Sequence, residues 1–238
     1  MRTLLRRSLV PSVAAAALLL VGCSSSSPAA STATAPTPHP SPTTNGVERL
    51  TAEQILARTR AAALSASSVR ATGTMGATKV DLLVGPDSAR LTLSQHGETA
   101  VVLHAGGAYY IKGDRAFWSK EVSPRAAALL AGRYVKVPAS KVTDFAVFMS
   151  YPRFVRDTLT PSGHVTKGRQ TTVAGAAAIT LRDVDGSLLY VSLVGAPYPL
   201  RVENHPASAG AVTFTGWGRP VNVQPPPAAQ VLDLSKVA

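Results

Sequence analysis

The residue best suited to chemistry in this sequence is its single cysteine, Cys23, which lies between an apolar run and four serines. Leu20-Val21-Gly22-Cys23 fits the bacterial lipobox, in which the cysteine thiolate is the nucleophile that takes up a diacylglyceryl group. Residues 1–22 carry three arginines near their start and then a short apolar run, which is typical of a secretory signal peptide. The sequence therefore predicts a cysteine that carries lipid (diacylglyceryl and palmitate) and anchors the chain to the extracytoplasmic face of a cell membrane. An ordinary signal peptide with an incidental cysteine is the alternative.

The other reactive side chains form no catalytic or metal-ligating pattern. No Gly-x-Ser-x-Gly motif is present. Residues 183–186, Asp-Val-Asp-Gly, resemble the start of a calcium loop, but the later acidic ligand is missing and a hairpin turn explains them better. The histidines with no partner at ligand spacing are His96, His104, His164 and His205. We therefore expect no enzyme activity, no cofactor and no metal.

A tether follows the cysteine. Residues 24–46 contain no Lys, Arg, Asp or Glu and consist almost wholly of Ser, Pro, Ala, Thr and Gly. Such a composition cannot bury enough apolar surface to fold, so residues 23–46 are predicted to be a disordered spacer behind the lipid. Residues 47–238 have the length of a single domain, and no internal repeat or second linker divides them.

Positive charge is concentrated in the middle of this domain. Residues 112–169 hold eleven basic and four acidic side chains, a net charge of +7. An anionic surface, either lipid headgroups or the cell envelope, is the expected partner. The expected contacts are Lys136, Lys141, Arg153 and Arg156. A solvated basic face is the alternative, and nucleic acid is not expected for an exported, tethered chain without a nucleic-acid motif.

The start of the domain has the pattern of a helix N-terminus. Thr51 and Gln54 have the spacing of a capping box, and Leu50 can contact Ile55 across the first turn. These residues predict a helix over 52–65.

Two further helical segments are expected in the middle of the chain. Residues 123–132 predict a short helix with Ser123 as its N-cap and Gly132 beyond its end. Residues 141–159 carry apolar side chains at helical spacing, and Pro152 is expected to break this helix in two.

Segments with β-type alternation lie on either side of the central helices. They are residues 69–75, 77–84, 89–95, 99–105, 108–113 and 116–120, and then 164–173, 176–183, 187–195, 198–204 and 211–217. The gaps between neighbours are hairpin-sized and hold turn residues such as Asp185-Gly186, which indicates antiparallel meanders. The order of elements predicts an α+β fold with a large, curved antiparallel β-sheet packed on a few helices.

Three phrases and the order of elements add a family resemblance. The phrases are GGAYYIKGDRAFWSK (106–120), GRYVKVP (132–138) and FTGWGRPVNVQPPPAAQVLDL (214–234). They resemble the actinobacterial LppX/LprG lipoproteins, which share the fold of the periplasmic lipoprotein carriers LolA and LolB. The resemblance covers residues 47–238. It implies an incomplete β-barrel that wraps helices and encloses an apolar cavity for the acyl chains of glycolipids or envelope lipids, with no catalytic motif.

A cavity of this kind requires alternate strand residues to point inward. The expected lining consists of Leu82, Val84, Leu91, Leu93, Val101, Leu103, Tyr109, Ile111, Phe145, Phe148, Met149, Leu189, Val191 and Leu193. A dry core filled by the same side chains is the alternative, because every domain needs one.

The anchor and the resemblance together predict a membrane-anchored envelope lipoprotein that binds lipid or glycolipid acyl chains and carries or presents them. The expected partners are the lipid ligand, the membrane through Cys23, and an envelope transporter of unknown identity. The chain is expected to be monomeric. A protein-interaction or sensory lipoprotein with the same fold and a closed core is the alternative.

Overall fold

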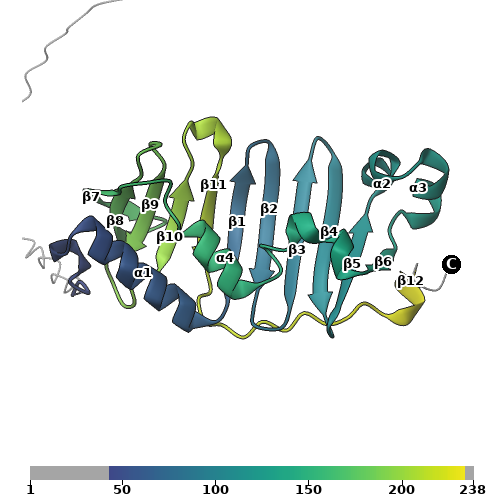
Figure 1. The fold of residues 1–238 in the computed structure, drawn as a ribbon, viewed down its shortest axis with the longest axis horizontal. Coiled ribbons are helices and arrows are strands. Elements are labelled where there is room, and N and C mark those ends of the chain that lie inside the picture. The colour runs from purple at the N-terminus through teal and green to yellow at the C-terminus, as the bar shows by residue number, and fades with distance from the viewer. Residues whose placement is uncertain (1–42, 234–238) are drawn as a thin grey trace, which may run out of the picture. The chain divides into compact units, whose positions relative to one another are not determined.

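The computed structural model describes residues 43–233, which lie within a compact unit of residues 41–238. The predicted signal peptide, Cys23 and most of the predicted tether lie outside the described residues. Residues 43–233 form one sheet and the helices that cover it (Figure 1). They also contain two clusters of buried side chains. Because this unit has a hydrophobic core of its own, we expect it to fold as an independent domain.

The sheet consists of two antiparallel meanders. The first meander is β1 (Val69–Met75), β2 (Thr78–Val84), β3 (Ala89–Gln95), β4 (Glu98–Ala105), β5 (Ala108–Gly113) and β6 (Tyr134–Val137). The second is β7 (Thr166–Val173), β8 (Ala176–Arg182), β9 (Leu188–Ser192), β10 (Pro199–Glu203) and β11 (Ala211–Thr215). Pairing of β1 with β11 joins them, and β12 (Val231–Asp233) adds to the edge beside β6. The resulting order is β12-β6-β5-β4-β3-β2-β1-β11-β10-β9-β8-β7.

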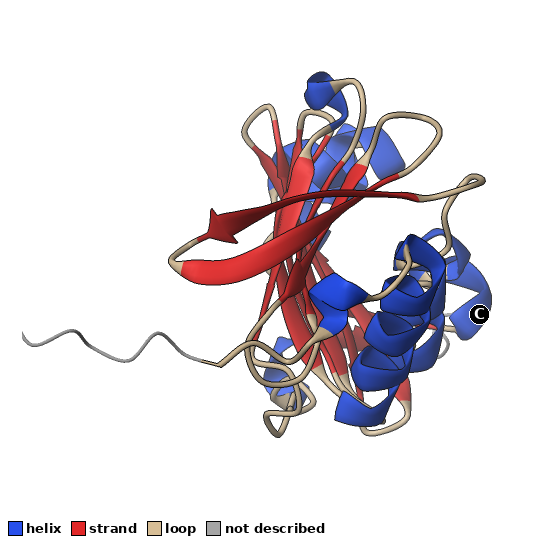
Figure 2. Ribbon diagram, turned by 90° about the vertical axis from the view of Figure 1, so that its left-hand side faces the viewer, coloured by secondary structure: helices blue, strands red, loops and turns tan. Residues whose placement is uncertain are grey.

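The predicted α+β fold with a large curved sheet is confirmed, with two refinements. The sheet is open, because β12 and β7 at its two edges do not pair with each other. It is also mixed, because β12 runs parallel to β6 while the other pairs are antiparallel. Figure 2 shows the curvature of the strands and the longer helices beside one face of them, with shorter helical segments elsewhere.

The join between the two meanders depends on a glycine. Gly73 of β1 lies opposite Val212 of β11. A Cβ atom at Gly73 would lie 1.9 Å from the carbonyl oxygen of Ala211, closer than any van der Waals contact allows. Only a residue without a side chain therefore permits the two strands to pair here.

The strand predicted over residues 116–120 is wrong, because these residues lie in α2 (Arg115–Glu121). Asp114 is the reason: its carboxylate accepts hydrogen bonds from the backbone N–H groups of Phe117 and Thr99, at 2.8 and 2.6 Å. The first bond caps the helix and the second holds it against β4. α3 (Pro124–Leu130) follows, with Ser123 as the predicted N-cap.

The first predicted helix is confirmed as α1 (Ala52–Ala66). Its capping box is complete: the Gln54 N–H donates to Thr51 Oγ1 at 3.3 Å, and the Thr51 N–H donates to Gln54 Oε1 at 3.1 Å.

Pro152 begins a helix instead of breaking one. It lies in the first turn of α4 (Tyr151–Thr158), where the backbone N–H that proline lacks has no intrahelical partner in any helix. The rest of the predicted segment forms short 3₁₀ turns. The 3₁₀ helices of the described residues are η1 (Val47–Arg49), η2 (Ala139–Lys141), η3 (Thr143–Phe145), η4 (Ala207–Ala209) and η5 (Ala228–Gln230).

The sheet has one face packed against α1 and α4, here termed the inner face. In the first meander, one row of inner-face residues runs across neighbouring strands, each paired with the next: Ala71, Leu82, Leu91, Val102 and Ile111. These side chains belong to a first core cluster with Trp118, Met149, Phe154 and Phe214. A second cluster joins α1 to β8 and β9, through Ile55, Leu56, Ile179, Leu181 and Val191.

Tyr151 ties the two covering helices together. Its hydroxyl, at the start of α4, donates a hydrogen bond to the backbone carbonyl of Ala63 in α1. Burial raises the pKa of this phenol well above its usual range, with a smaller contribution from Tyr198, so it stays a donor at physiological pH.

None of the helices within residues 43–233 combines the length and the apolarity needed to cross a membrane.

Candidate functional site

A cavity of about 400 Å³ lies on the inner face of the second meander. Its apolar walls come from α1, from α4 and the residues around it, and from strands β1, β8, β9, β10 and β11. The wall residues are Leu56, Met75, Val147, Phe148, Phe154, Leu159, Pro161, Val165, Leu181, Leu189, Val202, Val212 and Phe214. The volume is within the range of small-molecule sites.

The cavity lies between the two core clusters. Phe154, Leu159 and Phe214 of its wall belong to the first cluster, whereas Leu56 and Leu181 belong to the second. The two clusters both contact Leu189, and the cavity lies beside this residue, with wall residues from each cluster.

Aromatic rings form the side of the cavity nearest α4. Phe154 lies between Phe148 and Phe214, with 6.3 Å between ring centroids on each side. Phe214 in turn contacts Trp217 at 5.9 Å, and the Trp217 indole N–H donates to the carbonyl oxygen of Pro199 at 3.0 Å. These contacts fix the rings, so this wall is preformed.

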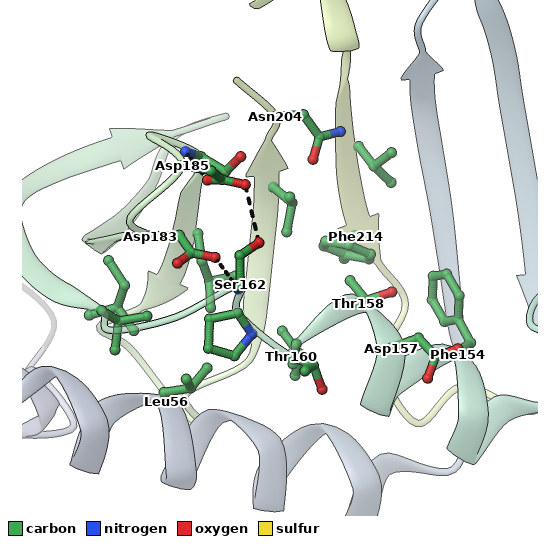
Figure 3. Close-up of a pocket in the computed structure, with 18 of the residues that line it drawn as sticks. Leu56, Phe154, Asp157, Thr158, Thr160, Ser162, Asp183, Asp185, Asn204 and Phe214 are labelled. Carbon is green, nitrogen blue, oxygen red and sulfur yellow. Dashed lines mark hydrogen bonds between the residues drawn. The ribbon is translucent and has the colours of Figure 1, made fainter. Parts of the chain in front are cut away.

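The mouth of the cavity is polar and acidic. Figure 3 shows polar side chains on more than one side of the site, with Asp183, Asp185 and Ser162 on one side and Asp157 and Thr158 near Phe154 on another. They are Asp157, Thr158, Thr160, Ser162, Asp183, Asp185, Ser187 and Asn204. Among the described residues that line the cavity, three are carboxylates and none is Lys, Arg or His.

Two of the carboxylates hold the mouth together. The Ser162 N–H, in the segment after α4, donates to Asp183 at 2.6 Å, and the Ser162 hydroxyl lies 3.4 Å from Asp185 (Figure 3). The Ser187 N–H donates to Asp185 at 2.8 Å. Hydrogen bonds from Ser187 are the main cause that lowers the pKa of Asp185, so its charge persists at neutral pH.

The Asp183-Val184-Asp185-Gly186 segment is the turn between β8 and β9, as the hairpin interpretation expected. The Gly186 N–H donates to the Asp183 carbonyl at 3.0 Å, and the Asp183 N–H donates to the Ser187 carbonyl at 2.9 Å. Within residues 43–233 no group of three or more His, Cys, Asp or Glu side chains is arranged to hold a metal ion.

The structure places two of the fourteen predicted lining residues, Phe148 and Leu189, at the cavity. Most of the others are packed side chains of the core. Those in or against the first cluster are Leu82, Val84, Leu91, Leu93, Tyr109, Ile111, Phe145 and Met149. Val191 and Leu193 lie in the second cluster.

The orientation predicted for Val101 and Leu103 is wrong by one residue. Their neighbour Val102 pairs with Leu91 and Ile111 on the inner face, so Val101 and Leu103 point to the opposite face. The continuous apolar run of β4 explains the error, because both registers place apolar residues inward.

None of the four predicted headgroup cations lines the cavity, although Arg153 contacts the lining residue Asp157. Lys136 of β6 pairs with Asp233 of β12 at 3.5 Å. Arg153 pairs with Asp157 along the exposed side of α4 at 3.6 Å. Lys141 and Arg156 are exposed, on η2 and α4.

The wall residues missed from the sequence include those of β10 and β11. Val202, Val212 and Phe214 alternate with polar residues in these strands, and that pattern could have identified them. The sequence indicated only a turn at Asp183 and Asp185, and no signal placed Asp157, 26 residues before Asp183, at the same cavity.

An open curved sheet, helices on its inner face and a cavity between them define the LppX/LprG type of lipoprotein fold, which the sequence resemblance predicted and the structure confirms at the level of the fold. Among solved structures, LprF from Mycobacterium bovis matches with 17% identity over 74% of this chain and 96% of its own, at a TM-score of 0.50. The lipoprotein LppX from Mycobacterium tuberculosis has 15% identity over 72% of this chain and 99% of its own, at a TM-score of 0.45. No known family model and no curated protein sequence matches the chain.

Proposed function

We propose that this protein is a membrane-anchored envelope lipoprotein that binds an acyl chain of a lipid in the cavity and carries or presents that lipid. The observation that supports the proposal is the apolar space of about 400 Å³ between two core clusters. A bound acyl chain would cover the apolar wall, and removal of apolar surface from water is favourable. The LppX/LprG resemblance implies the same class of ligand.

The volume sets the size of the buried part of the ligand. With each methylene taking about the volume of one liquid water, ~30 Å³, the cavity of about 400 Å³ holds roughly a dozen of them. This is one acyl chain or most of one. Any second chain and the headgroup lie at or outside the mouth.

The acidic mouth favours an uncharged headgroup that carries hydroxyl groups. Asp183 and Asp185 would repel a phosphate or carboxylate placed there, whereas the third carboxylate, Asp157, is paired with Arg153. Hydroxyl groups of a sugar or glycerol can instead donate hydrogen bonds to these carboxylates. A neutral glycolipid therefore suits this site better than an anionic phospholipid.

The test uses residues 41–238 without the anchor. After removal of co-purified lipid, the domain is offered a neutral glycolipid and a phosphatidylglycerol with the same acyl chains, and complexes are counted by native mass spectrometry. We expect one lipid per protein and a preference for the neutral headgroup. A domain that takes up neither lipid contradicts the carrier function, and a preference for phosphatidylglycerol contradicts the headgroup assignment.

Anchoring through Cys23 belongs to the same proposal and has its own test. Cells grown with labelled palmitate are expected to label the full chain and not the Cys23→Ala variant, and only the unaltered chain should fractionate with membranes. Equal labelling of both chains would exclude Cys23 as the attachment site.

The alternative, an interaction or sensory lipoprotein without lipid cargo, predicts a different result in the uptake experiment. Its domain remains lipid-free and its melting temperature does not respond to lipid. The open space between the core clusters favours the lipid carrier over this alternative.

A further inference from the structure

The hairpin of α2 and α3 exposes apolar side chains at its surface. Leu129 of α3 is 71% exposed, more than any other large apolar side chain within residues 43–233. Val122, where α2 ends, is 51% exposed. The exposed face of α3 combines Arg125, Ala128 and Leu129, which share one side of the helix through their i, i+3 and i+4 spacing.

This exposure is not a sign of a loosely packed segment. Trp118 of α2 and Ala127 of α3 are buried in the first core cluster, and Leu130 packs against it. Asp114 and Ser123 cap the two helices by accepting from the Phe117 and Ala126 N–H groups, at 2.8 and 3.3 Å. The hairpin is therefore held by one side while Leu129 points away from the protein.

The residues of the hairpin and its ends carry several cations. Arg115, Lys120, Arg125 and Arg133 are all exposed, and Glu121 is the single acidic residue between positions 115 and 133. Lys120 also forms an ion pair with Glu98 of β4, at 2.5 Å. An exposed leucine on a segment rich in exposed cations, with Arg125 one turn before it, is the pattern of an element that enters a membrane interface, with apolar atoms below the headgroups and cations among them.

We propose that the α2–α3 hairpin is a second membrane contact, which inserts Leu129 into the interface of an anionic bilayer. The exposed apolar area is confined to a few side chains, far less than the roughly 800 Å² per partner of a stable protein interface. A bilayer needs no such area, because each cation near an anionic surface adds to the binding. The hairpin lies at the β5–β6 part of the sheet, whereas β8–β11 border the cavity, so docking leaves the mouth free (Figure 1).

A fluorescent probe gives the most direct test. Residues 41–238 contain no cysteine, so a Leu129→Cys variant can be labelled at one position with a dye that reports polarity. Leu64→Cys is the matched control, because Leu64 on α1 is 41% exposed and distant in sequence from the hairpin. With vesicles of equimolar phosphatidylcholine and phosphatidylglycerol we expect a blue shift at position 129 and none at 64. No shift at 129, or an equal shift at both positions, would overturn the proposal.

Vesicle cosedimentation separates the apolar and ionic contributions. We expect Leu129→Ser to lower the partition coefficient roughly threefold to tenfold, and Arg125→Gln with Arg133→Gln to lower it roughly tenfold or more at low salt. The controls are Leu64→Ser and the pair Lys141→Gln with Arg156→Gln. Because these side chains lie outside the proposed interface, we expect each control to change the partition coefficient by less than about twofold. Larger losses in the controls than in the hairpin variants would refute this placement.

Two further readouts keep the result interpretable. Circular dichroism of each variant must match that of the unaltered domain, since exposed side chains contribute little to stability. Light scattering without vesicles tests whether the hairpin instead binds a second copy of the protein. A dimer that Leu129→Ser dissociates would show such binding and would overturn the membrane assignment. Lipid uptake in the cavity is expected to be unchanged by Leu129→Ser, so failure of this proposal is distinguishable from failure of the carrier function.

Discussion

The inner face of the sheet is filled over β2–β5 and bordered by a cavity over β8–β11. Leu82, Leu91 and Val102 in the first region are completely buried, because Trp118, Met149 and other side chains close over them. In the second region Leu189, Val202 and Val212 remain only partly buried. The same alternation of apolar and polar residues thus produces a packed core in one region and a binding site in the other. The difference lies in what packs against the sheet.

The covering elements explain the difference. Over β2–β5 the cover includes large side chains from α2, η3 and the segment before α4. Over β8–β11 the cavity is covered by Leu56 of α1 and Phe154 of α4, with Leu159 and Val165 from the segment that follows. These side chains leave space that the strands do not fill by themselves.

The largest expected effect comes from breaking the pairing of β1 with β11, which joins the two meanders. Gly73→Val places side-chain atoms where the Ala211 carbonyl now lies, so β1 and β11 cannot pair. We expect a loss of more than about 4 kcal/mol in the free energy of unfolding, enough to prevent folding of a typical domain. Urea denaturation followed by circular dichroism measures it.

Gly107→Asn is the control for this change. Gly107 lies in the β4–β5 turn with a φ of 72°, and no atom lies within 4 Å of its potential Cβ. Asparagine tolerates this left-handed conformation, so we expect a loss below about 1 kcal/mol. Equal losses at both glycines would show that the close approach at the join is unimportant.

A smaller effect should separate the filled region from the open one. Leu91→Ala removes a fully buried side chain and should cost about 3–5 kcal/mol, whereas Leu189→Ala enlarges a space that already exists and should cost about 1–2 kcal/mol. Thermal denaturation of the lipid-free domain measures both. Equal costs would mean that the second region is packed as tightly as the first.

Adding volume should have opposite effects in the two regions. Val202→Phe directs a ring into the cavity, so we expect unchanged or increased stability and loss of lipid uptake. Val102→Phe overpacks the filled core and should cost about 1–3 kcal/mol without a specific effect on lipid. Lipid uptake that survives Val202→Phe would place the ligand elsewhere.

The sequence predicted most of the fold because its signals are local. The capping box at Thr51, the N-cap at Ser123 and the hairpin at Asp185-Gly186 each act within a few residues, and each is confirmed. The strand over 116–120 was wrong although the cap at Asp114 is equally local, because its aromatic residues favoured a strand. The cavity could not be located this way. Which alternating strand borders empty space depends on the helix packed against it, and that is a long-range property.

The smallest expected effects concern two carboxylates with lowered pKa, one in each meander. In the first, Arg70 donates two hydrogen bonds to Asp81, at 3.0 and 2.8 Å, and these are the main cause that lowers the Asp81 pKa. Because both side chains are partly exposed, we expect Asp81→Asn to cost only about 0.5 kcal/mol at pH 7. This contribution is present above the unfolded-state pKa of about 3.9 and is lost as the pH falls through the lower pKa of the folded state. Lipid uptake should not change.

In the second meander, Asp185→Asn should change the choice of lipid and leave the stability almost unaltered. Asparagine keeps an oxygen that can accept from the Ser187 N–H, so the mouth should retain its shape and the melting temperature should change little. Removal of one of the three charges at the mouth should raise the uptake of phosphatidylglycerol by roughly threefold relative to the neutral glycolipid. Competition between the two lipids, read by native mass spectrometry, measures this ratio. If Asp185→Asn leaves the ratio unchanged while Asp81→Asn alters it, charge at the mouth does not select the headgroup, and the carboxylates serve only to hold the β8–β9 turn against the segment that follows α4.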